Sequence, residues 1–180
     1  MCDFIKTHSS QADDKNNIHC IWYCVAAEEQ RTIHSLEKQF FKTLATIAPH
    51  IPVVLLFTKY DEFVGQVQLD WSRDAQERGL SKVAVTHILR DLSTKRFETM
   101  IGSKWDEVLQ MGGTREQHRV QRVCVASDGD GGEGEESFEK LAEVTLAGLR
   151  ERNVKLAFAV AQRNSALMST HCKFHLIIII

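Results

Sequence analysis

The feature that most constrains the fold is a short segment, residues 53–57, in which every side chain is apolar (VVLLF). A strand with one face in water alternates apolar and polar residues, so a fully apolar strand must be covered on both faces. Such strands are typical of parallel sheets that carry helices on either side. Pro52 precedes the segment and fits the first position of a strand, where the missing N–H group is tolerated.

Two further segments predict strands beside it. Residues 18–26 (IHCIWYCVA) are rich in β-branched and aromatic side chains, and residues 120–126 (VQRVCVA) predict a third strand later in the chain. Between the first two strands, residues 28–48 carry apolar side chains at spacings of three and four, which predicts an amphipathic helix. The expected buried stripe of this helix consists of Ile33, Leu36, Phe40, Leu44 and Ile47.

The rest of the chain predicts mainly helices and polar loops. Helices are expected over 64–110, with a break near Gly79, over 136–152 and over 154–162, and loops at 7–17, 61–62 and 128–135. Strands and helices therefore alternate along the chain. This order predicts the α/β class, with a mostly parallel sheet between two layers of helices in a three-layer sandwich.

Composition bounds the kinds of partner and the compartment. Lys and Arg number 22 against 24 Asp and Glu, so no net field favours nucleic acid or an anionic membrane. Hydrophobic residues make up 43% of the chain, but no run of about eighteen apolar residues occurs that would span a bilayer. The five cysteines are odd in number and scattered, which indicates reduced thiols in an intracellular protein, and we expect it in the cytoplasm.

The residues that carry chemistry follow the fully apolar strand directly, as Thr58-Lys59-Tyr60-Asp61. Ligands of open parallel α/β sheets bind beyond the carboxyl ends of the strands. An aspartate there can accept two hydrogen bonds from one planar edge, and guanine offers such an edge in its N1–H group and its exocyclic amine. Adenine has no donor at N1, so it would leave a desolvated carboxylate oxygen unpaired, at a cost of about 1–3 kcal/mol. The stem of Lys59 can lie flat against a base while its ammonium group stays solvated.

The stretch PVVLLFTKYD, residues 52–61, resembles the guanine-specificity motif of P-loop GTPases, (Asn/Thr)-Lys-x-Asp after a buried strand. The resemblance implies that Asp61 pairs with the base edge, that Lys59 covers the base, and that Thr58 bridges the motif to neighbouring loops. The segment IHCIWYCV, followed by a predicted helix and by PVVLLFTKYDEFV, is also similar to the corresponding segments of a group of fungal predicted GTP-binding proteins. The resemblance covers residues 18–163 and implies that they form part of a P-loop NTPase-like G domain, the half that recognises guanine.

The last motif of the same family implies a second contact with the base. It is written around Ser-Ala-Lys and follows the next strand, where a backbone N–H group contacts the guanine carbonyl. The matching residues here are Val125-Ala126-Ser127-Asp128, which lack the lysine. By this resemblance, the guanine-binding residues are Thr58, Lys59, Asp61, Ala126 and Ser127.

The family also needs parts that this sequence does not contain. No phosphate loop of the form G-x-x-x-x-G-K-[ST] occurs, and no Asp-x-x-Gly precedes residues 18–26. We therefore expect an N-terminally truncated domain that binds GTP or GDP weakly and takes up Mg²⁺ only if the missing half is supplied. The resemblance implies a GTPase, but we expect no GTP hydrolysis from this chain alone. The strand at 18–26 would lie at an open edge, through which copies of the chain could associate.

Other interpretations of the same residues stay open. Lys59 and Asp61 would also fit a solvated loop in which the aspartate caps a helix. An alternative function is a non-catalytic protein-interaction module or a degenerate pseudo-GTPase, since no metal-ligand spacing or serine-hydrolase elbow indicates another enzyme. The G-x-G-x-x-G pattern at 129–134 is surrounded by acidic side chains that would repel a pyrophosphate, and we interpret it as a loop.

The two ends of the chain lie outside the predicted domain. Residues 1–17 predict a polar leader, and residues 164–180 predict a disordered or apolar tail that ends in FHLIIII. This apolar end is too short to span a bilayer. Within the domain, Cys20 and Cys24 lie on one face of their strand and are expected in the core.

Overall fold

The computed structural model describes residues 2–9, 17–28, 32–78, 82–111, 120–126, 133–150, 152–163 and 176–179. In chain order the elements are α1 (Cys2–His8), β1 (Cys20–Ala26), α2 (Ser35–Ile47), β2 (Val53–Thr58), α3 (Tyr60–Arg78), α4 (Lys82–Phe97), the π-helical turn η2 (Glu98–Gly102), α5 (Ser103–Met111), β3 (Gln121–Cys124), α7 (Glu133–Gly148), α8 (Arg152–Arg163) and β4 (Leu176–Ile179). Helices separate the strands along the chain, as the α/β class requires.

The strands form one parallel sheet in the order β3-β2-β1-β4. β1 and β2 pair from Ile21 opposite Val53 to Ala26 opposite Thr58. β3 lies on the other side of β2, where Phe57 is opposite Cys124. The predicted α/β class with a parallel sheet is therefore confirmed, and the fully apolar strand β2 is an interior strand.

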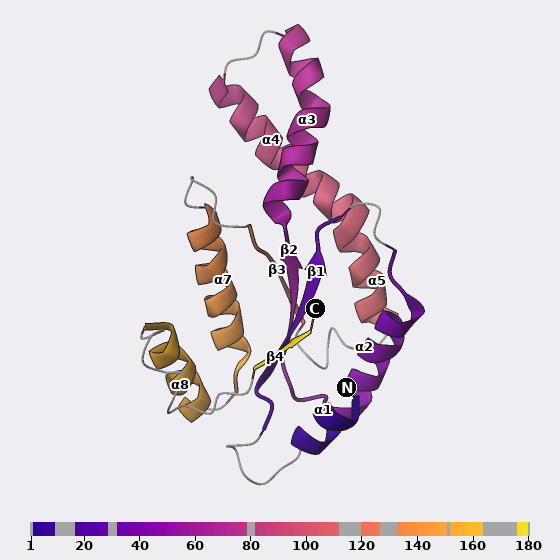
Figure 1. Cartoon of the computed structure of the whole chain (residues 1–180), viewed down its shortest axis with the longest axis vertical. Helices are drawn as coiled ribbons and strands as arrows, with labels where there is room; N and C mark the ends of the chain where they lie inside the picture. The colour runs from indigo at the N-terminus through magenta and orange to yellow at the C-terminus, as the bar shows by residue number, and fades with distance from the viewer. Residues whose placement is uncertain are drawn as a thin grey trace.

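Helices cover both faces of this sheet. Figure 1 shows α2 and α5 on one side of the strands, and α7 and α8 on the other. Side chains of β2 alternate between the two resulting cores: Val53, Leu55 and Phe57 belong to the first, and Val54 and Leu56 to the second. All of these side chains are buried, which confirms that β2 is covered on both faces. Each such side chain contributes about 1.5–3 kcal/mol through removal of apolar surface from water.

Helix α2 is shorter than the expected 28–48, and it is rotated relative to the expected buried stripe. Leu44 is fully buried as predicted, but Leu36 is 79% exposed, so its placement in the core was wrong. The reason is the buried Glu37, whose carboxylate accepts a hydrogen bond from the hydroxyl of Tyr23 on β1 at 3.1 Å. Glu37, Phe40, Phe41 and Leu44 are the buried side chains of the helix, and Leu36 lies outside the face that they form, so it meets water.

The C-terminal end of the chain joins the sheet. β4 pairs with β1, with Cys20 opposite Leu176 and Tyr23 opposite Ile179. The edge that we expected to be open is therefore occupied along Cys20–Tyr23 by the chain's own apolar end. Of the two alternatives for the tail, disordered or apolar, residues 176–179 match the apolar one and form a strand. The physical reason is that a β-branched apolar run pairs readily with a strand edge that offers unpaired backbone groups.

The N-terminal end is also part of the fold. Cys2–His8 form α1, and Ile5 is fully buried in the core that contains α2 and α5. The expected polar leader over 1–17 is therefore wrong for these residues. A helix of two turns with a single buried residue is too short for its periodicity to be recognised in the sequence.

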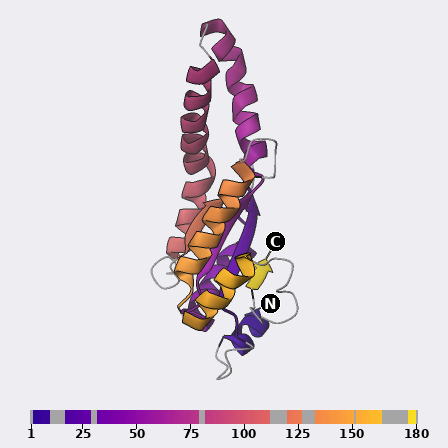
Figure 2. The same ribbon diagram turned by 90° about the vertical axis from the view of Figure 1, so that its left-hand side faces the viewer.

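Helices α3 and α4 pack side by side and extend beyond the sheet (Figure 2). α3 begins at Tyr60, so the loop expected at 61–62 was wrong, and Asp61 and Glu62 form the first helical turn instead. The expected break near Gly79 falls between α3 and α4, outside the described residues. Among the described residues, no helix combines the length and the apolar character needed to cross a bilayer.

Raising the pH above about 9 should destabilise the fold through Cys20, which is fully buried as predicted. Burial raises the pKa of its thiol from 9.0 to about 12, so the folded chain keeps a proton that the unfolded chain releases. The free energy of unfolding should therefore fall by about 1.4 kcal/mol per pH unit in this range from this group. Urea titrations at about pH 8 and about pH 10.5 measure this loss. The free energy of unfolding of Cys20→Ala should fall less between these two pH values than that of the native chain. An equal loss in both chains would contradict it.

Candidate functional site

Hydrogen bonds between backbone groups hold the carboxyl ends of the three strands β1, β2 and β3 together. Ala27, just after β1, donates its N–H to the carbonyl of Thr58 at 2.9 Å. Val125, just after β3, donates to the carbonyl of Phe57 at 2.8 Å and accepts the N–H of Tyr60 at 3.2 Å. The predicted motif at 58–61 therefore lies at the centre of this corner, with a strand end on either side.

Thr58 is the last residue of β2, and its hydroxyl donates to the carbonyl oxygen of Val25 on β1 at 3.4 Å. A hydrogen bond of this length is weak. Even so, it ties the first residue of the motif to the neighbouring strand β1. The bridge from Thr58 to neighbouring loops stays a prediction.

Lys59 makes the turn from β2 into α3. Its φ is 59°, and within the part of the chain that the structure describes it is the one residue other than glycine with a positive φ. That conformation costs about 1–2 kcal/mol, and such strain gathers at functional sites. The carbonyl of Lys59 accepts the N–H of Phe63 at 3.2 Å, so α3 starts immediately after the strand. Its ammonium group lies 3.5 Å from Glu62, an exposed pair that contributes little to stability.

Asp61 lies in the first turn of α3 and is half-buried. The N–H groups of a first helical turn and the helix dipole favour a negative charge at this position. This position therefore suits a carboxylate that contacts a ligand, and it suits equally a carboxylate that only stabilises the start of the helix. Glu62 occupies the same turn but is exposed, so it offers a matched comparison for the two roles.

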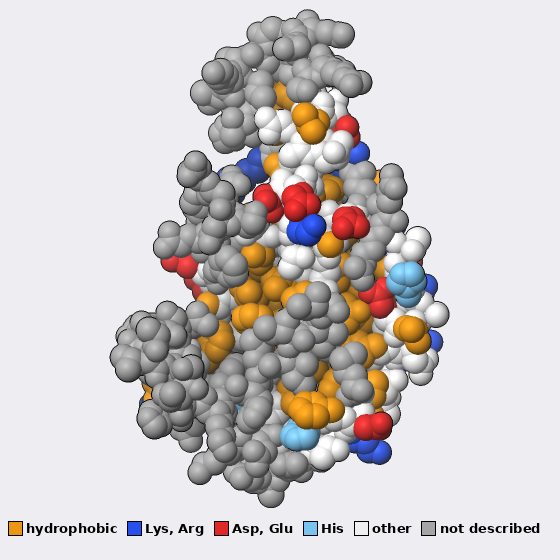
Figure 3. Space-filling model, viewed as in Figure 1, with side chains coloured by type: hydrophobic (Ala, Val, Ile, Leu, Met, Phe, Trp, Pro, Cys, Tyr) orange, Lys and Arg blue, Asp and Glu red, His pale blue; other side chains and the backbone are white. Residues whose placement is uncertain are grey.

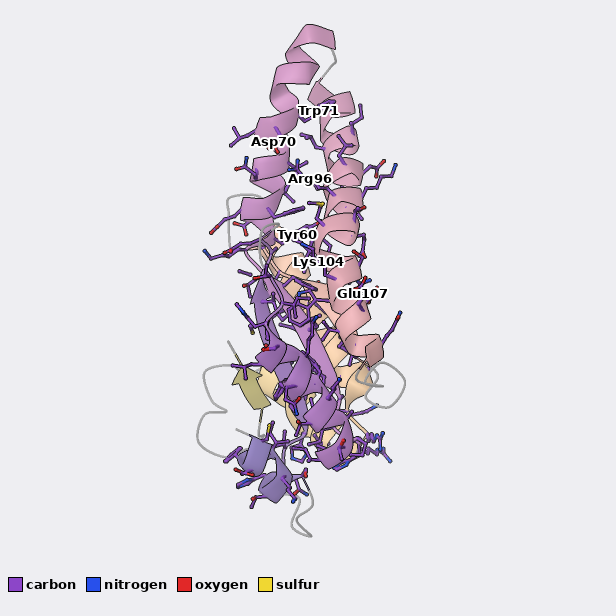
Figure 4. All side chains as sticks on the ribbon, turned by 90° about the vertical axis from the view of Figure 1, so that its right-hand side faces the viewer. Tyr60, Asp70, Trp71, Arg96, Lys104 and Glu107 are labelled. Carbon is purple, nitrogen blue, oxygen red and sulfur yellow. The ribbon has the colours of Figure 1, made fainter. Side chains whose placement is uncertain are left out.

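Tyr60, the residue between Lys59 and Asp61, has no role predicted from the sequence. Its ring packs against Phe63, with centroids 5.8 Å apart, and against Phe97, with centroids 5.4 Å apart. Burial is the main cause that raises the pKa of its hydroxyl above the ordinary value of 10.0. Figure 4 shows Tyr60 at the end of α3 nearest the sheet, between the two residues of the predicted motif that are expected to contact the base. The spacing of Tyr60 and Phe63, three residues apart, was the available signal for a helix here.

The second predicted segment reaches the same corner in part. Ala126 follows β3 and is 6% exposed, next to Val125, whose backbone bonds connect it to β2 and α3. Ser127 lies outside the described residues. The structure therefore places Thr58, Lys59, Asp61 and Ala126 at one edge of the sheet, as the sequence analysis expected from adjacent parallel strands.

The charges at this corner are mixed in sign. The exposed side chains directly after the strands include Glu28, Lys59 and Glu62. Figure 3 shows acidic and basic side chains gathered above an apolar area in the middle of this face. Among residues 26–28, 58–62 and 125–126, Lys59 is the only cation. The corner therefore offers hydrogen-bond acceptors for a base edge and one positive charge, which is little for a chain of phosphates.

The chemistry available at the corner is recognition through hydrogen bonds and stacking. No group of three or more His, Cys, Asp or Glu residues that could hold a metal ion occurs among the described residues. Neither a protein-family model, nor a curated protein, nor a solved structure matches the chain. The assignment of a function therefore depends on the residues of this corner and on their geometry.

Proposed function

We propose that the chain binds guanine nucleotides through the base, at the corner formed by Thr58, Lys59, Asp61 and Ala126. The sheet would then correspond to the guanine-recognising half of a P-loop NTPase-like domain. In this proposal the carboxylate of Asp61 accepts the N1–H and the exocyclic amine of guanine. The stem of Lys59 covers one face of the base, and the backbone after β3 contacts the guanine carbonyl.

The observation that carries the proposal is the strained turn at Lys59. A left-handed backbone at a residue other than glycine costs free energy, and here it brings Asp61 into a helical turn directly beyond a buried parallel strand. The carboxyl ends of parallel strands are where α/β sheets bind ligands. A solvated connection between β2 and α3 would need neither the strain nor the backbone bonds to β1 and β3.

The proposal concerns recognition of the base and not hydrolysis. The sequence contains no Gly-rich loop ending in Lys-Ser/Thr, whose N–H groups would hold the phosphates. Phosphate contacts supply much of the affinity for a nucleotide, so binding by this chain should be weak. Mg²⁺ would bind only together with a partner that supplies the phosphate-binding residues.

Thermal unfolding with GDP, with ADP and without nucleotide tests the proposal. At a GDP concentration about ten times its Kd, stabilisation should be about 1.4 kcal/mol, or a rise of about 3–5 °C in Tm. ADP at the same concentration should give a much smaller rise. Asp61→Ala should abolish the effect of GDP, whereas Glu62→Ala, a change of the neighbouring carboxylate in the same helical turn, should retain it.

Three results would count against the proposal. An equal rise with ADP would show that the corner does not distinguish the bases. A rise with GDP that survives Asp61→Ala would mean that this carboxylate only stabilises the start of α3. If no nucleotide changes Tm, the alternative of a non-catalytic interaction module takes the place of guanine binding.

A further inference from the structure

A second site lies away from this corner, in the hairpin of α3 and α4. A cavity of about 470 Å³ opens between these helices and the start of η2. Cavities of about 300–1,000 Å³ are the usual size for sites that bind small organic molecules. Figure 4 shows Trp71 from α3 and Arg96 from α4 in the space between the two helices. The volume of the cavity falls within this range, and none of its lining residues belongs to the guanine-binding corner.

The walls of the cavity are mainly apolar. Val67 and Trp71 contribute from α3, Leu92 from α4 and Met100 from η2. Met100 is 39% exposed and Trp71 is half-buried, so large apolar side chains meet water here instead of packing into the core. An aromatic ring and a flexible thioether are well suited to contact a planar apolar ligand. Filling the cavity would remove this surface from water.

The rim of the cavity carries an excess of positive charge. Nη1 of Arg96 lies 2.8 Å from Oδ2 of Asp70, an ion pair that joins α4 to α3 and fixes the guanidinium group in place. Lys95 also lines the cavity, and its ammonium group has no ion-pair partner among the residues that the structure describes. Among the described residues that line the cavity, two are cations and one is an anion, which leaves one positive charge beside an apolar wall.

We propose that this cavity binds a small amphipathic organic anion. An aromatic or otherwise flat apolar body would lie against Trp71 and Met100, and its carboxylate or sulfonate group would pair with Lys95 at the rim. The Asp70–Arg96 ion pair would act as a positioning contact that holds the two helices at the spacing the ligand needs. The apolar wall supplies affinity, and the unpaired ammonium group supplies selectivity for an anion.

Fluorescence titration of the full chain tests this proposal with two probes that share one ring system. The first, 8-anilinonaphthalene-1-sulfonate, is an anion, and the second, N-phenyl-1-naphthylamine, lacks the sulfonate. We expect saturable binding of one equivalent of each, with the anion bound about tenfold more tightly. Lys95→Gln should remove this preference because it weakens binding of the anionic probe alone. Lys42→Gln, a change of an exposed lysine on α2, should leave the affinities of both probes unchanged.

Two further variants test the apolar wall. Trp71→Leu should weaken the binding of both probes. Met100→Asp places a carboxylate at a partly exposed position and should abolish binding of the anionic probe. A cooperative thermal transition in each variant shows that the chain is folded. The proposal is overturned if the native chain binds the two probes equally, if Lys95→Gln leaves the preference for the anion intact, or if Met100→Asp binds the anion as the native chain does.

Discussion

Replacing Leu44 with alanine should lower the free energy of unfolding by about 2–5 kcal/mol, whereas the same replacement at Leu36 should change it by less than about 0.5 kcal/mol. Both residues belong to α2, but Leu44 is fully buried and Leu36 is 79% exposed. Leu44→Ala removes buried methyl groups and leaves a cavity, while Leu36→Ala removes groups that already meet water. Urea denaturation of the two variants beside the native chain measures the difference.

The pair of variants tests how α2 is rotated against the sheet. Glu37 determines this rotation, because its carboxylate accepts the N–H of His34 at 2.8 Å and the hydroxyl of Tyr23 at 3.1 Å. The first bond belongs to a capping box, which fixes where the helix begins. If Leu36→Ala cost as much as Leu44→Ala, the helix would be rotated toward the stripe that spacing alone predicts.

The second large effect is expected at Asp61. Asp61→Asn should change the base that the chain prefers from guanine to xanthine. Guanine presents two donors to the carboxylate, its N1–H and its exocyclic amine. Xanthine keeps the N1–H but has a carbonyl oxygen in place of the amine, so it presents one donor and one acceptor. The amide of asparagine presents the matching acceptor and donor, whereas a carboxylate would face the xanthine carbonyl oxygen with a repulsive contact.

The expected size of this exchange follows from the cost of unpaired polar groups. A lost hydrogen bond to a charged group, with its partner left desolvated, costs about 1.5–3 kcal/mol, or about 10- to 150-fold in Kd. The native chain should therefore favour GDP over XDP by at least about tenfold, and Asp61→Asn should reverse the order. A role of Asp61 that is limited to stabilising the first turn of α3 predicts no such reversal, because the base would play no part.

The sheet could be predicted from the sequence because its signal is local. Five consecutive apolar side chains after a proline favour a strand that is covered on both faces, and the structure places them between two cores. The parallel pairing of β1 with β2 follows from the helix between them, since a crossover connection of this length joins parallel strands.

The errors come from contacts that local patterns do not contain. β4 pairs with a strand more than 150 positions earlier in the chain, and the run of isoleucines does not indicate which strand it pairs with. Leu36 has the correct spacing for the buried stripe, but the hydrogen bond from Tyr23 to Glu37 buries a charged side chain beside it. The loop expected at 61–62 is helical because Lys59 adopts a conformation that few residues other than glycine adopt.

The candidate site also has parts with a local sequence signal and parts that depend on distant contacts. The motif Thr58-Lys59-x-Asp61 was found from its residue types and from the strand before it. The contribution of Tyr60 depends on Phe97, which comes from another helix, so it became visible only in the tertiary structure. The guanine-binding role itself stays a prediction, which rests on the chemistry of Asp61 and on the strained turn before it.

Calorimetric titration of GDP and XDP into the native chain and into Asp61→Asn measures whether the carboxylate of Asp61 recognises the base. We expect the native chain to bind GDP at least about tenfold more tightly than XDP, and the order to be reversed in the variant. Glu62→Gln, which changes the neighbouring carboxylate in the same way, should keep the native order. Equal affinities for the two nucleotides in the native chain, or a preference that Asp61→Asn leaves unchanged, would contradict recognition of the base by this carboxylate.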